Sequence, residues 1–296
     1  MRILIVGRSG QLAQELAARL PRDGHQVTAL GQPELDLARP ETIARAVEQV
    51  APEAIVNAAA YTAVDRAEDE RDAAFAVNET GSGLLAQEAA GRGVPLVHVS
   101  TDYVFDGTKD GPYAEDDVTG PQGVYGASKL AGEQAVLAAH PRSVVLRTAW
   151  VCGAHGNNFL KTMLRLGAER EKLSVVADQH GAPTFTADIA EAIARMLPGL
   201  AAAPAGDARF GVFHYSGLPF TTWHGFATEI FRQAAGRGAK VPGEVAAITT
   251  DQYPTKAKRP ANSRLDCTRI TAVHGIDPAD WRVSLSTALD GLLSRG

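Results

Sequence analysis

The sequence predicts an α/β fold in which helices cover both faces of a doubly wound parallel sheet, with a smaller lobe built from the C-terminal part of the chain. Three observations predict this fold. Short apolar runs alternate with helical stretches through the first half, a glycine-containing turn follows the first run, and the alternation loosens near residue 150. The length of 296 residues suits a main domain with a smaller partner.

Five apolar runs of the first half are expected to be strands. None of them alternates apolar and polar residues, which is typical of strands that helices bury on both faces. The runs are Ile3–Val6, Gln26–Leu30, Ala54–Asn57, Leu96–Ser100 and Val144–Leu146. The helical stretches between them lie at residues 11–20, 40–50, 72–91 and 125–139. This repetition predicts parallel strands joined by right-handed crossovers.

The C-terminal half has a looser rhythm. The expected elements are one more strand at Gly211–Tyr215 and helices at residues 158–170, 186–197, 222–235 and 284–294. Leu200–Gly206 is interpreted as a connector, and the polar segment 251–264 as a loop. We therefore expect a main domain over residues 1–150, to which segments near residues 180–235 return, and a lobe formed mostly by residues 151–296. A ligand would lie at the carboxyl ends of the strands, between the lobes.

Composition and charge exclude several classes of protein. Hydrophobic residues make up 45% and charged residues 21% of the chain, close to the averages for globular proteins, which excludes bulk disorder. The net charge is −5 and no basic block stands out, so nucleic acid is not an expected partner. No apolar run reaches about 18 residues, so no membrane span is expected.

The N-terminus and the cysteines favour a cytoplasmic protein. The first seven residues have the pattern of a strand and lack the long apolar stretch and cleavage site of a signal peptide. Cys152 and Cys267 are too few for a disulfide framework or a structural zinc site, and we expect two buried thiols. His98, on a predicted strand, and Trp223, on a predicted helix, are interpreted as packing residues.

The turn Gly7-Arg8-Ser9-Gly10-Gln11-Leu12-Ala13 follows the first strand and opens a helix. Glycines let the backbone bend sharply and approach a pyrophosphate, and the helix N-terminus offers free N–H groups to that anion. The spacing is G-x-x-G-x-x-A rather than G-x-G-x-x-G, and an ordinary tight turn is the alternative. Its position directly after the first strand favours a Rossmann-type fold, with a dinucleotide-binding domain over residues 1–150.

The second strand bears on the choice of cofactor. It ends Ala29-Leu30-Gly31, without the acid that would bind the ribose hydroxyl of NAD, and Arg8 is placed to meet a 2′-phosphate. We therefore expect NADPH, with NADH as the alternative. Asp36 is placed to reach the adenine side or to cap the following helix. Ala58-Ala59-Ala60, after the third strand, leaves room for a flat ligand, although small residues also suit a helix–strand contact.

Hydroxyl, phenol and amine groups come together after the fourth strand. Ser100 and Thr101 end that strand, and Tyr125 and Lys129 lie four residues apart at the start of the next helix, so both face the same side. Moving the pKa of a tyrosine from about 10 toward 7 needs about 4 kcal/mol of preferential stabilisation of the phenolate. A nearby lysine ammonium and an oxidised nicotinamide ring can supply it. The pattern predicts a proton-transfer site.

With these motifs the chain resembles the extended short-chain dehydrogenase/reductases and, within them, the dTDP-4-dehydrorhamnose reductase family. The Ser-Thr-Asp-Tyr-Val-Phe and Arg-Pro-x-Asn-Ser motifs point most narrowly to these reductases. The matching stretches span nearly the whole chain and lie at residues 7–11, 56–65, 100–107, 125–133, 147–151, 156–159, 179–184 and 259–265.

The resemblance implies reduction of the 4-keto group of dTDP-4-dehydro-L-rhamnose, the last step in making dTDP-L-rhamnose. Tyr125 would protonate the sugar oxygen, Lys129 would hold the nicotinamide ribose and lower the pKa of the phenol, and Thr101 would hydrogen-bond the reacting carbonyl. Asp102 and Trp150 would contact the sugar. The residues expected at the cofactor are Gly7, Gly10, Gln11, Leu12, Asp36, Leu37, Ala60, Tyr61, Thr62, Tyr125 and Lys129.

Two charged segments have alternative interpretations. Lys256-Ala257-Lys258-Arg259 is expected either to clamp the substrate pyrophosphate, with Arg259 as the main contact, or to be a solvated loop. The mixed charge run Asp65–Asp72 is interpreted as a solvated loop and helix start.

Two other functions stay open at this point. One is a nucleotide-sugar epimerase or dehydratase with tightly bound NAD, although a dehydratase needs an acid/base pair and only Asp102 follows Thr101. The other is a non-catalytic regulatory subunit, which the intact Tyr125 and Lys129 argue against.

The resemblance also bears on metals and assembly. Certain family members dimerise through a metal held by carboxylates near both termini. Glu15 is present here, but its partner positions are Ala187 and Gly291. No metal is therefore expected, and the chain would be a monomer or a homodimer without a metal bridge.

Overall fold

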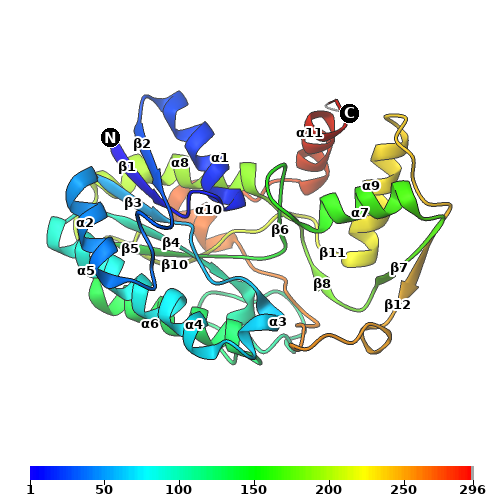
Figure 1. Cartoon of the computed structure of the whole chain (residues 1–296), viewed down its shortest axis with the longest axis horizontal. Coiled ribbons are helices and arrows are strands. Elements are labelled where there is room, and N and C mark those ends of the chain that lie inside the picture. Colours follow the sequence, from blue (N-terminus) through cyan, green and yellow to red (C-terminus); the bar gives the residue numbers. More distant parts are fainter. Residues whose placement is uncertain (295–296) are drawn as a thin grey trace.

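The computed structural model describes residues 1–294, and its centre is a six-stranded parallel sheet with the order β10-β5-β4-β3-β1-β2 (Figure 1). All neighbouring strands pair in parallel. The strands are β1 (Arg2–Val6), β2 (Gln26–Leu30), β3 (Ala54–Asn57), β4 (Leu96–Thr101), β5 (Ser143–Thr148) and β10 (Gly211–His214). The strand order reverses between β1 and β3, so the predicted doubly wound fold is confirmed.

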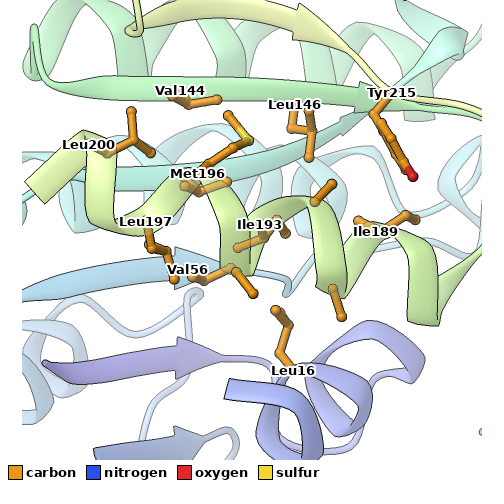
Figure 2. Close-up of a cluster of buried hydrophobic side chains, with 14 of the residues drawn as sticks. Leu16, Val56, Val144, Leu146, Ile189, Ile193, Met196, Leu197, Leu200 and Tyr215 are labelled. Carbon is orange, nitrogen blue, oxygen red and sulfur yellow. The ribbon is translucent and has the colours of Figure 1, made fainter. Parts of the chain in front are cut away.

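Alternate residues of the central strands enter two separate cores, one on each face of the sheet. Ile3 and Ile5 of β1 pack on one face, and Leu4 and Val6 on the other. The helices of the first face are α1 (Gln11–Arg19), α8 (Thr186–Ala202) and α10 (Thr268–His274). Those of the second face are α2 (Pro40–Val50), α5 (Ser82–Arg92) and α6 (Val124–Ala139). Figure 2 shows the side chains of α8 filling the space between β5 and α1.

A smaller group of elements, on the right of Figure 1, has its own apolar core, in which Phe226 and Trp281 are buried. Its elements are α7 (Phe159–Glu169), β7 (Lys172–Val176), α9 (Trp223–Ala235), β12 (Glu244–Ile248) and α11 (Trp281–Leu293). The strands β7 and β12 pair in parallel. Two further short pairs are β6 (Val151–Cys152) with β9 (Thr184–Phe185), and β8 (His180–Gly181) with β11 (Thr221–Thr222).

The region after β3 carries shorter helical segments. These are α3 (Val64–Ala67), α4 (Arg71–Phe75) and a π-helical turn at Ala76–Gly81 that continues into α5. Three 3-10 turns lie at Leu20–Asp23, Asp102–Val104 and Thr250–Gln252. The predicted helix over residues 72–91 is therefore helical throughout but interrupted by the π turn.

Three predictions differ from the structure. β2 is half exposed rather than buried on both faces, because it is the edge strand of the sheet. Leu200–Gly206 is not wholly a connector, since α8 continues through Pro198 to Ala202 and buries Leu200 in the core. The strands β7 and β12 and helix α10 were not predicted, because segments of five to seven residues are too short for their pattern to be told from that of a loop.

Segments near residues 180–235 contribute β10 to the main sheet, α8 to the core on one face of that sheet, and α9 to the smaller core. The domain boundary near residue 150 stays a prediction, and the last two residues of the 151–296 lobe lie outside the described residues. Cys152 and Cys267 are free and buried, as expected. Within residues 1–294, no helix is both long enough and apolar enough to cross a bilayer.

Candidate active site

A cavity of about 1000 Å³ opens at the carboxyl ends of β1, β3, β4 and β5. It lies at the point where the strand order reverses, where open parallel sheets bind their ligands. The structure brings nearly all predicted site residues to it. These are Gly7, Gly10, Gln11, Leu12, Asp36, Leu37, Ala60, Tyr61, Thr62, Thr101, Asp102, Tyr125, Lys129 and Trp150. Arg259 instead lines an adjoining cavity of about 680 Å³, and Tyr103 lines both.

The glycine turn packs closely against the chain that follows β3. Gly7 has a φ of +112°, and a Cβ there would lie only 3.0 Å from the backbone nitrogen of Ala59. Within residues 1–294, no side chain caps the N-terminus of α1 at Gly10. The free N–H groups and the helix dipole therefore face the cavity and suit a pyrophosphate.

Beside the cavity, Arg8 pairs with an acid that sequence reasoning missed. Arg8 Nη1 lies 3.2 Å from Glu34 Oε1, and both side chains are about half exposed. Asp36 Oδ1 accepts a hydrogen bond from the Ala38 N–H at 2.9 Å, so its carboxylate orders the turn before α2. Glu34 lies four residues beyond β2, outside the position where a ribose-binding acid is expected.

Asn78 holds the segment that follows β3. Its Oδ1 accepts from the Tyr61 N–H at 2.8 Å, and its Nδ2 donates to the Tyr61 carbonyl at 3.1 Å and to Ser128 Oγ at 2.9 Å. The π turn directs this side chain toward both Tyr61 and α6. Sequence reasoning missed Asn78, since a polar residue in a helix gives no local sign of such contacts.

At the end of β4 the hydroxyl group of Thr101 contacts Asp102, and Tyr125 lines the same cavity. Thr101 Oγ1 donates to Asp102 Oδ1 at 3.1 Å and accepts from the Tyr103 N–H at 3.3 Å. Burial raises the pKa of Tyr125, hydrogen bonding with Thr101 opposes the rise, and the charge of Asp102 adds to it. Burial raises the pKa of Asp102 to about 6. Tyr125 therefore holds its proton at neutral pH.

Lys129 is 1% exposed and is held from β4. Its Nζ donates to the Val99 carbonyl at 2.8 Å and lies 3.3 Å from His98 Nε2. Burial lowers the pKa of Lys129 to about 8, and Glu133 opposes this shift. The predicted effect of Lys129 on the Tyr125 phenol stays a prediction, since the contacts of the amine are to β4.

His98 contacts Lys129 rather than only filling the core. Asn57 Oδ1 accepts from the Ala59 N–H, which turns Asn57 Nδ2 toward His98 Nδ1 at 3.1 Å. His98 Nδ1 must then accept, so the neutral ring carries its proton on Nε2, facing Lys129. Burial lowers the pKa of His98 well below its ordinary value, and the Lys129 charge lowers it further.

Trp150 and Arg259 complete the walls from different directions. Trp150 has a φ of +47°, and its ring stacks on Trp223 with centroids 3.7 Å apart. Arg259 Nη2 forms an ion pair with Asp65 Oδ2 at 2.6 Å, while its Nη1 is buried and has no partner among the described residues. Lys256 pairs with Asp69. The charge run Asp65–Asp72 is therefore not simply solvated, because the 251–264 loop folds onto it.

Glu15 matches one of the carboxylates that hold the bridging metal in certain family members, and here it contacts a histidine and a threonine. Its Oε1 lies 3.7 Å from His155 Nε2 and 3.5 Å from Thr186 Oγ1. Within residues 1–294, no group of three or more histidine, cysteine, aspartate or glutamate side chains is arranged to hold a metal ion.

A glycine turn after the first strand of a parallel sheet, and a tyrosine–lysine pair beside the end of its fourth, define an extended short-chain dehydrogenase/reductase. The family model described as the RmlD substrate binding domain matches residues 1–294. The chain belongs to this family.

Individual relatives agree over the full length. The chain is 45% identical to the dTDP-4-dehydrorhamnose reductase of Sinorhizobium fredii, across 100% of this chain and 99% of the relative. A crystal structure of the reductase from Clostridium acetobutylicum is 36% identical with a TM-score of 0.91, covering 99% and 100% of the two chains. That of Bacillus anthracis, in complex with NADP, is 34% identical with a TM-score of 0.90, covering 98% and 99%.

Proposed function

We propose that this chain is an NADPH-dependent reductase that converts the 4-keto group of dTDP-4-dehydro-L-rhamnose to the alcohol of dTDP-L-rhamnose. The observation that carries the proposal is that Thr101, Tyr125 and Lys129 line the same cavity as the glycine turn. A pyridine nucleotide and a sugar carbonyl can therefore meet beside a proton donor. The relatives named as dTDP-4-dehydrorhamnose reductases support the choice of substrate.

A pyridine nucleotide fits the residues of this cavity. Gly7, Gly10 and Gln11 line the cavity, and the N-terminus of α1 presents free N–H groups to the pyrophosphate. Bound there, the reduced nucleotide supplies the hydride. Arg8 lies beside Gly31 at the end of β2 and would meet a 2′-phosphate once it shares or releases Glu34. The NADP complex of the Bacillus anthracis relative supports NADPH.

Tyr125 supplies the proton. As hydride reaches C4 of the sugar, negative charge develops on O4, and the phenol donates its proton to that oxygen. The raised pKa of Tyr125 keeps this proton in place before the reaction. Thr101 Oγ1 orients the carbonyl by turning toward it the hydroxyl proton that it otherwise donates to Asp102, and Lys129, held by the Val99 carbonyl, binds the nicotinamide ribose.

The remaining polar groups bind the rest of the substrate. Asp102 Oδ2 is buried and, across residues 1–294, has no hydrogen-bond partner, so it is available to a sugar hydroxyl. Arg259 Nη1 is likewise available to the pyrophosphate. Asp65 and the loop that carries Arg259 would close the nucleotide side of the site.

The proposal includes a cytoplasmic location, a monomeric or homodimeric state and no resident metal. An epimerase or dehydratase on the same fold would cycle a tightly bound NAD⁺. That nucleotide would be released on denaturing the purified protein and seen by its absorbance.

The test is NADPH oxidation with dTDP-4-dehydro-L-rhamnose, run beside NADH and beside the Tyr125→Phe variant. We expect turnover by the natural chain and a loss of about 100-fold or more in kcat for Tyr125→Phe, because the proton donor is removed. Tyr253→Phe, at a 62% exposed tyrosine that lines the adjoining cavity, is a control for the proton-transfer step only: it should keep kcat even if it changes the KM of the substrate. No turnover by the natural chain contradicts the substrate, and full activity of Tyr125→Phe contradicts the proton donor.

A further inference from the structure

Trp150 has an unusual backbone conformation at the wall of the active-site cavity. Its φ of +47° lies in a region that bulky residues rarely adopt, and such residues persist only where their surroundings hold them. The residue follows β5 closely, and its carbonyl accepts from the Thr184 N–H at 3.2 Å. The indole is thereby directed from the sheet toward the smaller lobe.

Trp223, the first residue of α9, lies flat against this indole. The ring centroids are 3.7 Å apart and the planes differ by 14°. Thr222 caps α9 by accepting the Gly225 N–H at 3.1 Å, which fixes the start of the helix. Trp223 is not among the described residues that line the cavity, so any effect on a ligand passes through Trp150.

Gly181 determines where the edge of the Trp150 indole lies. A Cβ at this position would be 2.6 Å from Cε2 of Trp150, 2.8 Å from Cζ2 and 2.9 Å from Nε1. Any side chain here would push the indole out of its place. The glycine is thus required by the aromatic ring packed on it.

The Trp223 ring is itself anchored in the core of the smaller lobe. Phe159 lies 4.6 Å from it, Phe226 lies 5.5 Å from Phe159, and Trp281 lies 5.4 Å from Phe226, all between ring centroids. Phe226 and Trp281 are buried. A continuous row of aromatic rings therefore connects the packing of the lobe to the cavity wall.

We propose that Trp223 is a positioning residue for the reaction, which together with Gly181 holds the Trp150 indole as a flat wall for the sugar ring of the substrate. This inference rests on the proposed function. A flat aromatic surface suits the C–H face of a 6-deoxyhexose. β4 and β3 separate β5, which leads to Trp150, from β1 and the glycine turn, so the effect should fall on the sugar and spare the cofactor.

The stack itself can be measured without substrate. Trp150, Trp223 and Trp281 are the three tryptophans of the chain, and two indoles this close give an exciton couplet in the circular dichroism spectrum. We expect the couplet in the natural chain and in Trp281→Phe, and its loss in Trp150→Phe and Trp223→Phe. A natural chain without the couplet contradicts the inference.

Kinetics then separate positioning from general support of the fold. Trp223→Leu should raise the KM for the sugar nucleotide about three- to tenfold, the range expected for losing an aromatic pair. The KM for NADPH and kcat should stay within about twofold. Trp223→Phe keeps a flat ring and should recover most of the affinity, whereas Gly181→Ala should raise the same KM and weaken the couplet.

Two results would overturn the positioning role. One is an unchanged KM for the sugar nucleotide in Trp223→Leu. The other is a general impairment of both Trp223→Leu and Trp223→Phe, in which both KM values rise while kcat and the melting temperature fall. That result would indicate a structural role only. A natural chain with the couplet but no turnover contradicts the proposed function and leaves the measured stack in place.

Discussion

At the scale of the residue, Asp102 shows how the site departs from what stability alone would favour. Its side chain is 3% exposed, Oδ1 accepts from Thr101, and Oδ2 has no partner within the described part of the chain. Burial raises its pKa from 3.8 to about 6. The folded protein therefore binds this proton more tightly than the unfolded chain, so the carboxylate destabilises the fold as pH rises from about 4 to about 6.

Asp102→Asn should increase stability and reduce activity. The variant removes a buried charge, so the free energy of unfolding at pH 7.5 should rise by about 1–3 kcal/mol, and this gain should vanish near pH 4. Urea denaturation from pH 4 to pH 8 measures it. Asp110→Asn, which removes an exposed carboxylate, is the control and should change the free energy of unfolding by less than about 0.5 kcal/mol. A variant less stable than the natural chain at pH 7.5 would refute the argument.

At the scale of the element, α6 is placed partly by its glycines, which let its backbone approach its neighbours closely. A Cβ at Gly132 would lie 2.0 Å from the Asn78 carbonyl oxygen, and one at Gly126 would lie 2.2 Å from that of Tyr103. This close approach brings α6, with Tyr125 and Lys129, against β4 and the π turn. The sequence predicted the helix to within a residue, but its distance from neighbouring elements depends on backbone contacts that no local pattern contains.

Gly132→Ala should destabilise the protein although alanine favours helices. The new methyl group cannot be accommodated without moving α6, which should cost about 1–3 kcal/mol and lower kcat by shifting Tyr125. Gly91→Ala is the matched control, since Gly91 is exposed on α5 with open space around it. That change should stabilise by about 0.5–1 kcal/mol. Thermal unfolding of the two variants measures these changes. Equal melting temperatures for Gly132→Ala and Gly91→Ala would contradict the close packing of α6 as the reason for Gly132.

At the scale of the whole molecule, one buried ion pair joins several elements beneath the site. Arg147 of β5 binds Glu133 of α6, with Nη2 and Oε2 at 2.7 Å, and both side chains are at most 5% exposed. Ser100 of β4 donates to Glu133 Oε1 at 2.5 Å, and Arg147 Nη1 lies 3.4 Å from His214 Nε2 of β10. The sheet and α6 are thus connected by charge as well as by packing.

Breaking this pair should be severe, whereas replacing both partners should not. Arg147→Met leaves Glu133 buried and uncompensated and should lower the free energy of unfolding by about 3–5 kcal/mol. Adding Glu133→Leu should recover much of that loss. Arg165→Met, which breaks the exposed pair with Glu169, should change stability by less than about 1 kcal/mol. Denaturant titration of the natural chain, Arg147→Met, the double variant and Arg165→Met tests this prediction. It is wrong if Arg147→Met lowers the free energy of unfolding as little as Arg165→Met does.

The sequence by itself determined the features that depend on neighbours along the chain. The parallel sheet follows from the apolar runs, and the residues at the strand ends, such as Gly7 and Thr101, follow from their position beside those runs. The spacing of Tyr125 and Lys129 places them on one helical face. Their roles in catalysis stay predictions until the variants are measured.

Only the tertiary structure decided which distant residues meet. His98 faces Lys129, Asn78 holds Tyr61, Trp223 stacks on Trp150, and Asp65 pairs with Arg259. In each pair the partners come from different elements, and Asp65 and Arg259 are 194 residues apart. Periodicity and motif spacing describe contacts within one turn or one strand. Contacts between elements depend on how helices and sheet pack in three dimensions, which those local patterns do not specify.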